Sequence, residues 1–82
     1  MFYTYVLYSR EYKKIYIGFT SDPEARLNHH NHPLNHGWTA RFKSWEIIHL
    51  EEYQTKKEAL TREKQLKSAR GRKYIKSLIQ SD

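Results

Sequence analysis

Two short runs of β-branched and aromatic residues at the start of the chain most constrain its fold. The first covers residues 2–8 and the second residues 15–19, with the polar residues 9–14 between them. Runs of this composition are typical of strands, and the polar connection predicts a hairpin. Because alternate side chains of a strand share a face, Tyr5 and Tyr16 lie on one face if they pair directly or one step diagonally.

This tyrosine pair has two interpretations. Two phenols beside Gly18, a residue that lets another group approach the backbone, suggest a site. Tyrosine is also a favoured strand residue, and taken alone the pair is better explained as part of the core or of a sheet edge. The predicted register places Tyr3, Tyr5, Leu7, Tyr16 and Gly18 on one face and Val6, Tyr8, Ile15, Ile17 and Phe19 on the other.

The hairpin is followed by a strong signal for the start of a helix. Asp22 suits the N-cap, and Pro23 suits the first helical position. We expect this helix to end near Asn31. Arg26 and His30 are four residues apart in it, so their side chains share a helical face.

The second half of the chain predicts one more strand and two helices. Residues 45–53 have the composition of a strand, and Thr55 with Glu58 forms a capping box for a helix over about residues 56–69. We expect Gly71 to break that helix, and a short amphipathic helix follows. The order β-β-α-β-α-α predicts an α+β fold, a small three-stranded antiparallel sheet flanked by helices.

Glu63 is the acidic residue whose position needs an explanation. It falls within the apolar stripe of the second predicted helix, between Leu60 and Leu66. A carboxylate on the inward face of a helix is unfavourable unless it is paired or bound to a metal.

The net charge of +6 is concentrated in one segment. Residues 56–76 contain nine Lys or Arg and two Glu. Such a segment is typical of a nucleic-acid partner, although a solvated helix surface explains the charge equally well. The aromatic content of 15% favours nucleic acid, because aromatic rings beside cations stack on bases.

Length and composition set further limits. Eighty-two residues predict one domain, residues 1–82, and without cysteine neither a disulfide nor a thiolate metal site is available. No run is long enough to span a membrane, so we expect a cytoplasmic protein without a membrane partner. The histidines suggest zinc only weakly, since a carboxylate or thiolate partner is missing; a chance cluster or a phosphate contact explains them better. They are His29, His30, His32 and His36.

The remaining chemical groups are suited to hydrolysis of a phosphodiester. A carboxylate can hold one hard cation such as Mg²⁺, and an arginine can bind a phosphate through two hydrogen bonds. A phenol can accept a proton from water only if nearby cations lower its pKa, which is about 10 in water.

With these groups in place, the chain resembles the GIY-YIG nuclease superfamily, and in particular its small stand-alone bacterial members. Tyr3-Thr4-Tyr5 resembles the first family motif and Tyr16-Ile17-Gly18 the second. Residues 16–31 resemble the strand, turn and arginine-bearing helix of the family. The segments 38–42, 45–46, 51–52 and 59–67 resemble its loop, third strand and metal-binding helix.

The resemblance implies a set of catalytic residues and one Mg²⁺ or Mn²⁺ ion. Tyr5 and Tyr16 match the motif tyrosines, one of which acts as general base or orients the water. Arg26 matches the arginine that stabilises charge on the phosphate, and His30 the residue that relays a proton or holds a tyrosine. Glu63 matches the glutamate that binds the metal.

The function implied is cleavage of DNA by an endonuclease, with a role in DNA repair or recombination. Lys67, Arg70, Arg72 and Lys73 are the expected nucleic-acid contacts. A protein partner is expected to supply specificity, because no recognition module is attached. The alternatives are a nucleic-acid-binding module with little catalysis and a protein-interaction domain with a basic surface. The binding module is an alternative because larger family members have a late asparagine in the active site. This chain has no equivalent asparagine after Tyr74.

Overall fold

The strands of the chain form one antiparallel sheet, as the sequence predicts. The computed structural model describes residues 1–80, and within them the strands are β1 (Phe2–Ser9), β2 (Lys14–Thr20) and β3 (Glu46–Tyr53). The sheet order is β2-β1-β3, so the N-terminal strand is the central one. The predicted α+β fold, with the element order β-β-α-β-α-α, is confirmed.

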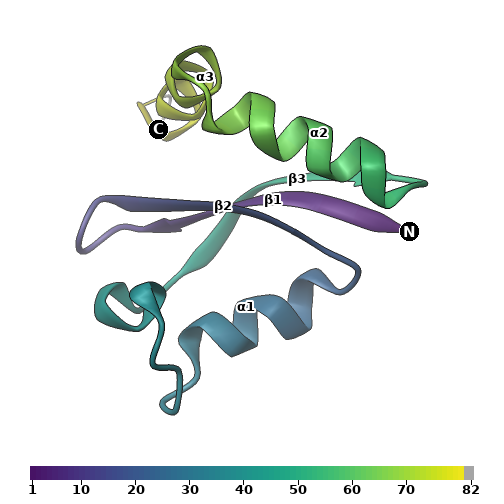
Figure 1. Cartoon of the computed structure of the whole chain (residues 1–82). Helices are drawn as coiled ribbons and strands as arrows, with labels where there is room; N and C mark the ends of the chain where they lie inside the picture. The colour runs from purple at the N-terminus through teal and green to yellow at the C-terminus, as the bar shows by residue number, and fades with distance from the viewer. Residues whose placement is uncertain (81–82) are drawn as a thin grey trace.

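The helices lie in two layers, one on each side of the sheet (Figure 1). Helix α1 (Pro23–Asn31) and the short 3₁₀ helix η1 (Trp38–Phe42) lie on one side. Helices α2 (Lys56–Lys67) and α3 (Ala69–Gln80) lie on the other. The sheet is therefore covered on both faces. Side chains from the two helical layers can meet only at an edge of the sheet.

Each face of the sheet carries its own small core. Val6 and Ile17 pack with Leu66 and Ile75 beneath α2 and α3. Burial of these apolar side chains is the main contribution that docks the two helices. A buried hydrogen bond of 2.7 Å from Thr4 Oγ1 to the carbonyl of Ala59 adds a polar tie between β1 and α2.

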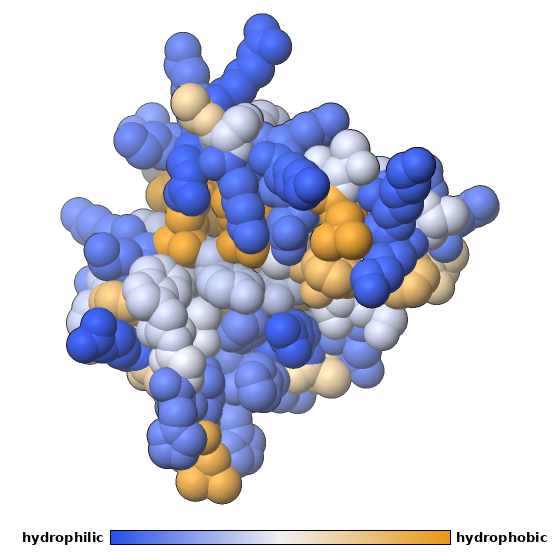
Figure 2. Space-filling model, in the orientation of Figure 1, coloured by the Kyte–Doolittle hydropathy of each residue, from blue (hydrophilic) through white to orange (hydrophobic). Residues whose placement is uncertain are grey.

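The second core lies under α1 and η1. Tyr5, Leu7 and Trp45 are buried there, and Tyr16 and Leu27 pack against them. Figure 2 shows that apolar side chains reach the surface on this view mainly in a band between the α2–α3 layer and the sheet, while polar side chains cover the helices.

The end of α2 differs from the sequence prediction. Gly71 does not break the helix; α2 ends at Lys67, and Gly71 lies buried in the first turn of α3. A Cβ at this position would lie 2.2 Å from the carbonyl oxygen of Gln65 and 2.4 Å from the Cα of Leu66. The glycine is therefore required by the close approach of the two helices and not by a special backbone conformation.

Candidate active site

The two motif tyrosines lie side by side on the α1 face of the sheet. Tyr5 pairs with Gly18 and Leu7 pairs with Tyr16, so the tyrosines are diagonal neighbours, as predicted. Their ring centroids are 6.2 Å apart. A Cβ at Gly18 would lie 2.6 Å from the Tyr5 hydroxyl, which means that the Tyr5 ring occupies the space above this glycine. The glycine of the second motif thus allows the tyrosine of the first to lie flat across β2.

His30 reaches this tyrosine pair from the last turn of α1. The helix starts where the sequence predicts, since the Asp22 side chain accepts a hydrogen bond from the Ala25 amide at 3.1 Å. His30 Nε2 lies 3.2 Å from the Tyr5 hydroxyl, and its ring centroid lies 4.6 Å from that of Tyr16. His30 is 4% exposed, so the imidazole is part of the core beneath the site.

Thr39 and Asn35 fix the orientation of the imidazole. His30 Nδ1 lies 2.9 Å from Thr39 Oγ1, and Asn35 Nδ2 donates to the same hydroxyl oxygen at 2.9 Å. Asn35 Nδ2 also donates to the His30 carbonyl at 3.0 Å. Both ring nitrogens of His30 therefore have partners, which holds the ring in one orientation.

The charge state of His30 follows from its burial. Desolvation lowers the pKa of His30 to about 4, with smaller contributions from the cationic Arg26 and from His29. The imidazole is therefore neutral at pH 7. A neutral ring can donate through one nitrogen and accept through the other.

Arg26 lies one helical turn before His30 and is exposed. Its pKa is raised, first by a side-chain hydrogen bond to Tyr5 and, with smaller contributions, by the charges and hydrogen-bonding of Tyr5 and Tyr16. The guanidinium thus lies against both phenols. Since a guanidinium has five N–H donors, it can bind a phosphate while it contacts the tyrosines.

Tyr5 does not have the lowered pKa that the sequence analysis requires of a general base. Burial raises the pKa of Tyr5, and the hydrogen bond and charge of Arg26 do not compensate for it. Tyr16 and the carboxylate of Glu63 raise it further. Arg26 alone therefore does not lower the pKa of Tyr5, because the Tyr5 hydroxyl is buried. The phenol stays protonated at neutral pH.

Glu63 approaches this group of residues from the opposite helical layer. It lies on α2, with a side chain that is 15% exposed, and its charge reaches Tyr5. Lys67 Nζ lies 3.6 Å from its Oε1, an ion pair between residues four apart on the helix. The inward carboxylate predicted from the sequence therefore has a cationic partner, and it still offers an oxygen ligand at the border of the site.

The donor atoms fit a hard cation better than zinc. Residues 1–80 contain no group of three or more His, Cys, Asp or Glu side chains placed to hold a metal ion. The Nδ1 of His32 accepts a hydrogen bond from the Leu34 amide at 3.1 Å. A single carboxylate such as Glu63 suits Mg²⁺, which keeps several waters and is completed by substrate phosphates.

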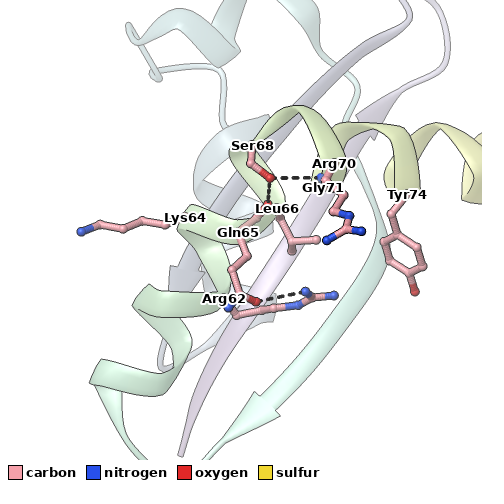
Figure 3. A pocket seen from close by; sticks show the side chains of 8 residues that line it. All are labelled: Arg62, Lys64, Gln65, Leu66, Ser68, Arg70, Gly71 and Tyr74. Atoms are coloured by element: carbon pink, nitrogen blue, oxygen red, sulfur yellow. Dashed lines mark hydrogen bonds between the residues drawn. The ribbon is translucent and has the colours of Figure 1, made fainter.

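The basic segment is divided between two places on the α2–α3 layer. Lys67 lies beside Glu63, and Arg72 Nε donates to the Lys67 carbonyl at 3.2 Å. Arg70 instead lines a separate hollow of about 700 Å³, where Figure 3 shows it projecting to the same side as Tyr74. Lys73 is exposed on α3. Arg70 and Arg72, two of the four residues predicted to contact nucleic acid, therefore line different hollows.

Two polar connections that support the site were missed by the sequence analysis. The Asn31 side chain accepts from the Trp45 amide at 2.7 Å and donates to the Trp45 carbonyl at 3.0 Å. Trp45 Nε1 donates to the Thr39 carbonyl at 2.8 Å. These bonds join the end of α1 to the start of β3 and to η1. The one sequence signal for this arrangement is an asparagine at the end of the helix, two residues before Pro33.

A partly buried ionic network connects β3 with α2. Glu51 accepts hydrogen bonds from Arg62 Nε at 2.9 Å, from the Tyr53 hydroxyl at 2.5 Å and from His49 Nε2 at 2.5 Å. Burial alone would raise the pKa of Glu51, but these hydrogen bonds outweigh it and lower the pKa to about 2. Because all of its oxygens are used, Glu51 is a structural carboxylate.

This fold and this group of residues define a class of nuclease domain. The family model described as the GIY-YIG catalytic domain matches residues 1–75, and the chain belongs to this family. The family is one of endonucleases that act on nucleic acid, and the chain has its nuclease fold. Comparisons with curated proteins and with solved structures found no match. Within residues 1–80, no helix has the length and apolar character needed to cross a bilayer.

Proposed function

We propose that the chain is a metal-dependent endonuclease that hydrolyses phosphodiester bonds in DNA, with a role in repair or recombination. The observation that carries the proposal is the meeting of Tyr16, Arg26 and the Tyr5–His30 pair on one side of the sheet. Glu63, in the other layer, is near enough for its charge to raise the pKa of Tyr5. These are the groups that in-line attack on a phosphate requires: an oriented nucleophile and neutralised charge.

The two tyrosines take different parts in this proposal. Tyr16 is the partly exposed phenol, so it is the one that contacts the attacking water. Tyr5 is 2% exposed and keeps its proton, so it positions the Arg26 guanidinium and the His30 ring. The neutral His30 ring holds Tyr5 through Nε2 and is itself held by Thr39 through Nδ1.

Arg26 and Glu63 complete the site. The exposed guanidinium of Arg26 binds the scissile phosphate and stabilises the charge that develops on its oxygens. Glu63 would hold one Mg²⁺ or Mn²⁺ ion. When bound, such an ion supplies Lewis-acid stabilisation of the phosphate and of the leaving oxygen. The ion pair with Lys67 orients the Glu63 carboxylate.

A cleavage assay with a matched pair of variants tests the proposal. Supercoiled plasmid, single-stranded DNA and branched DNA are incubated with the protein in Mg²⁺ or in chelator. We expect Glu63→Gln to lower the rate on the order of 100-fold, because it removes the metal ligand but preserves size. Glu52→Gln, at an exposed position of β3, is the matched control and should cleave like the wild type.

The same assay separates the alternatives. Equal cleavage by the wild type and Glu63→Gln, or cleavage that survives chelation, would contradict the assignment of Glu63 to the metal. Salt-dependent binding without cleavage would favour a nucleic-acid-binding module that keeps the fold. A partner protein that supplies specificity would appear as cleavage of defined sites only in its presence.

A further inference from the structure

Three aromatic side chains meet at the closed end of the hairpin, outside the group of candidate catalytic residues. Trp38 and Phe42 of η1 have ring centroids 4.8 Å apart, and Tyr12 of the β1–β2 turn packs edge-on against Phe42 at 5.6 Å. Trp38 also lies 6.0 Å from Trp45, which is buried. We refer to Tyr12, Trp38 and Phe42 as the aromatic platform. Figure 2 shows side chains of intermediate hydropathy gathered over the hairpin end and η1.

The platform leaves large ring surfaces in contact with water. Trp38 is 49% exposed and Tyr12 is 46% exposed. Single exposed apolar residues are common, but two exposed rings that both pack against Phe42 form a surface that a planar ligand can cover. Tilted ring pairs of this kind offer both a face and an edge for stacking.

The surroundings of the platform are cationic. Lys14 Nζ lies 5.5 Å from the Phe42 ring centroid, a cation–π contact. The two segments that carry the platform, residues 10–14 and 38–45, contain five basic residues and one acidic residue. On the α3 side of the hairpin end, Lys13 lines a hollow together with Arg72 and Lys76. Aromatic rings among cations complement a ligand that has both flat rings and negative charge, which describes a nucleotide chain.

The platform lies within reach of the candidate site. Lys14 and Tyr16 are two residues apart on the same face of β2, a distance of about 7 Å along the strand. Phe42 and Tyr16 pack against the same buried group of Tyr5, Leu7 and Trp45. A strand whose phosphate meets Arg26 and Tyr16 can therefore place a neighbouring base on the platform.

We propose that Tyr12, Trp38 and Phe42 form a stacking site for unpaired bases beside the scissile phosphate. This inference rests on the proposed nuclease function and extends it by naming the substrate class, which is nucleic acid with single-stranded bases next to the cut. In an intact duplex each base face is covered by its neighbours, whereas an unpaired base can place a face on an aromatic ring. Bulges, flaps, gaps and single-stranded ends meet this requirement.

The two tryptophans of the chain make the stacking directly measurable. Oligonucleotides of equal length, single-stranded or duplex, are titrated into the protein in the presence of chelator, and tryptophan fluorescence is recorded. Single-stranded oligonucleotide should quench the exposed Trp38, while the buried Trp45 contributes a constant background. We expect Trp38→Ala to abolish the quenching and to raise Kd for single strands about fivefold or more. The Kd for duplex should stay within about twofold.

A second set of variants keeps the test decisive if Trp38→Ala folds poorly. Trp38→Tyr preserves an aromatic face and should bind single strands nearly as well as the wild type, whereas Tyr12→Ala should weaken binding. Equal Kd values for the wild type, Trp38→Ala and Tyr12→Ala would overturn the stacking site, as would quenching by duplex equal to that by single strands. Quenching specific to a protein ligand, with none from oligonucleotide, would also overturn it.

The outcomes for the platform and for the nuclease are separable. Cleavage that depends on Glu63 but is indifferent to Trp38 and Tyr12 would refute the platform and leave the nuclease intact. Quenching and tight binding of single strands without any cleavage would refute the nuclease and leave the platform as a binding site.

Discussion

Tyr5 and Tyr16 show how two residues of one type acquire different properties from their places in the sheet. Tyr5 lies on the central strand, covered by His30 and packed over Gly18, so its hydroxyl is buried and its pKa is raised. Tyr16 lies on the edge strand and is partly exposed. The sequence motifs identify both residues, but only the strand order separates the positioning role from the water-contacting role that we propose.

His30 is expected to make the free energy of unfolding depend on pH between 6.5 and about 4. The ordinary pKa of His is 6.5 and that of buried His30 is about 4, so in this window the unfolded chain binds more protons. Stability is therefore fully present above pH 6.5 and is lost as pH falls toward 4. Urea unfolding of the wild type at pH 7.5 and 4.5 should show an added loss of about 2–3 kcal/mol relative to His30→Gln.

Two comparisons make this pH prediction specific. His36→Gln, at an exposed histidine in the loop after α1, should keep the wild-type pH dependence. Glu51, with a pKa of about 2, loses its contribution at more acidic pH, below 4.5, so it does not imitate the His30 effect. If the wild type and His30→Gln lost equal stability between pH 7.5 and 4.5, the neutral buried imidazole would be refuted.

At the scale of the elements, helix starts were predictable and one helix end was not. Asp22 and the Thr55–Glu58 capping box act as local signals, and both caps are present in the structure. Gly71 was misread because a glycine in the sequence indicates either a flexible backbone or a close contact. The contact with Gln65 and Leu66 depends on how two helices meet, which no local pattern records.

Gly71→Ala is expected to destabilise the chain even though alanine favours helices. Propensity alone would make the variant more stable by about 1 kcal/mol. The added Cβ would meet backbone atoms of α2 within 2.5 Å, so the two helices must move apart, at a cost of about 1–3 kcal/mol net. Thermal unfolding measures the difference, and a higher Tm for Gly71→Ala would contradict the close packing.

Gly37→Ala is the matched control for this prediction. Its Cβ would have one near atom, Asn35 Oδ1 at 3.3 Å, which belongs to a side chain and can adjust. Its Tm should therefore change much less than that of Gly71→Ala.

At the scale of the whole molecule, the sequence predicts which elements form the sheet and the helices better than it predicts where charged side chains gather on the surface. Alternation in the strands and the hydrophobic stripe of α2 are properties of neighbouring residues, so the sheet faces and helix order were predictable. The placement of Arg70 and Arg72 in different hollows depends on the angle between two helices. Charge counted along the sequence therefore does not indicate which hollow each cation lines.

A pair of charge reversals tests which basic group contacts nucleic acid. Arg72 donates to the carbonyl of Lys67, the residue that pairs with Glu63, so Arg72→Glu should weaken binding across all sequences and lower the slope of log K against log salt by about one. Arg70→Glu makes the same charge change on the same helix, but in a different hollow, and should alter the slope little. Equal effects of both reversals would indicate that nucleic acid covers both groups.

The phenols of the candidate site face α1, whereas the Glu63 carboxylate belongs to the helical layer on the other side of the sheet. The order in which these parts are synthesised therefore matters. The tyrosines, Arg26 and His30 emerge during synthesis well before Glu63 does. On the proposed mechanism, a nascent or half-unfolded molecule already has the phenols and the arginine but lacks the docked metal ligand. The proposed cleavage therefore requires that α2 has packed onto the sheet.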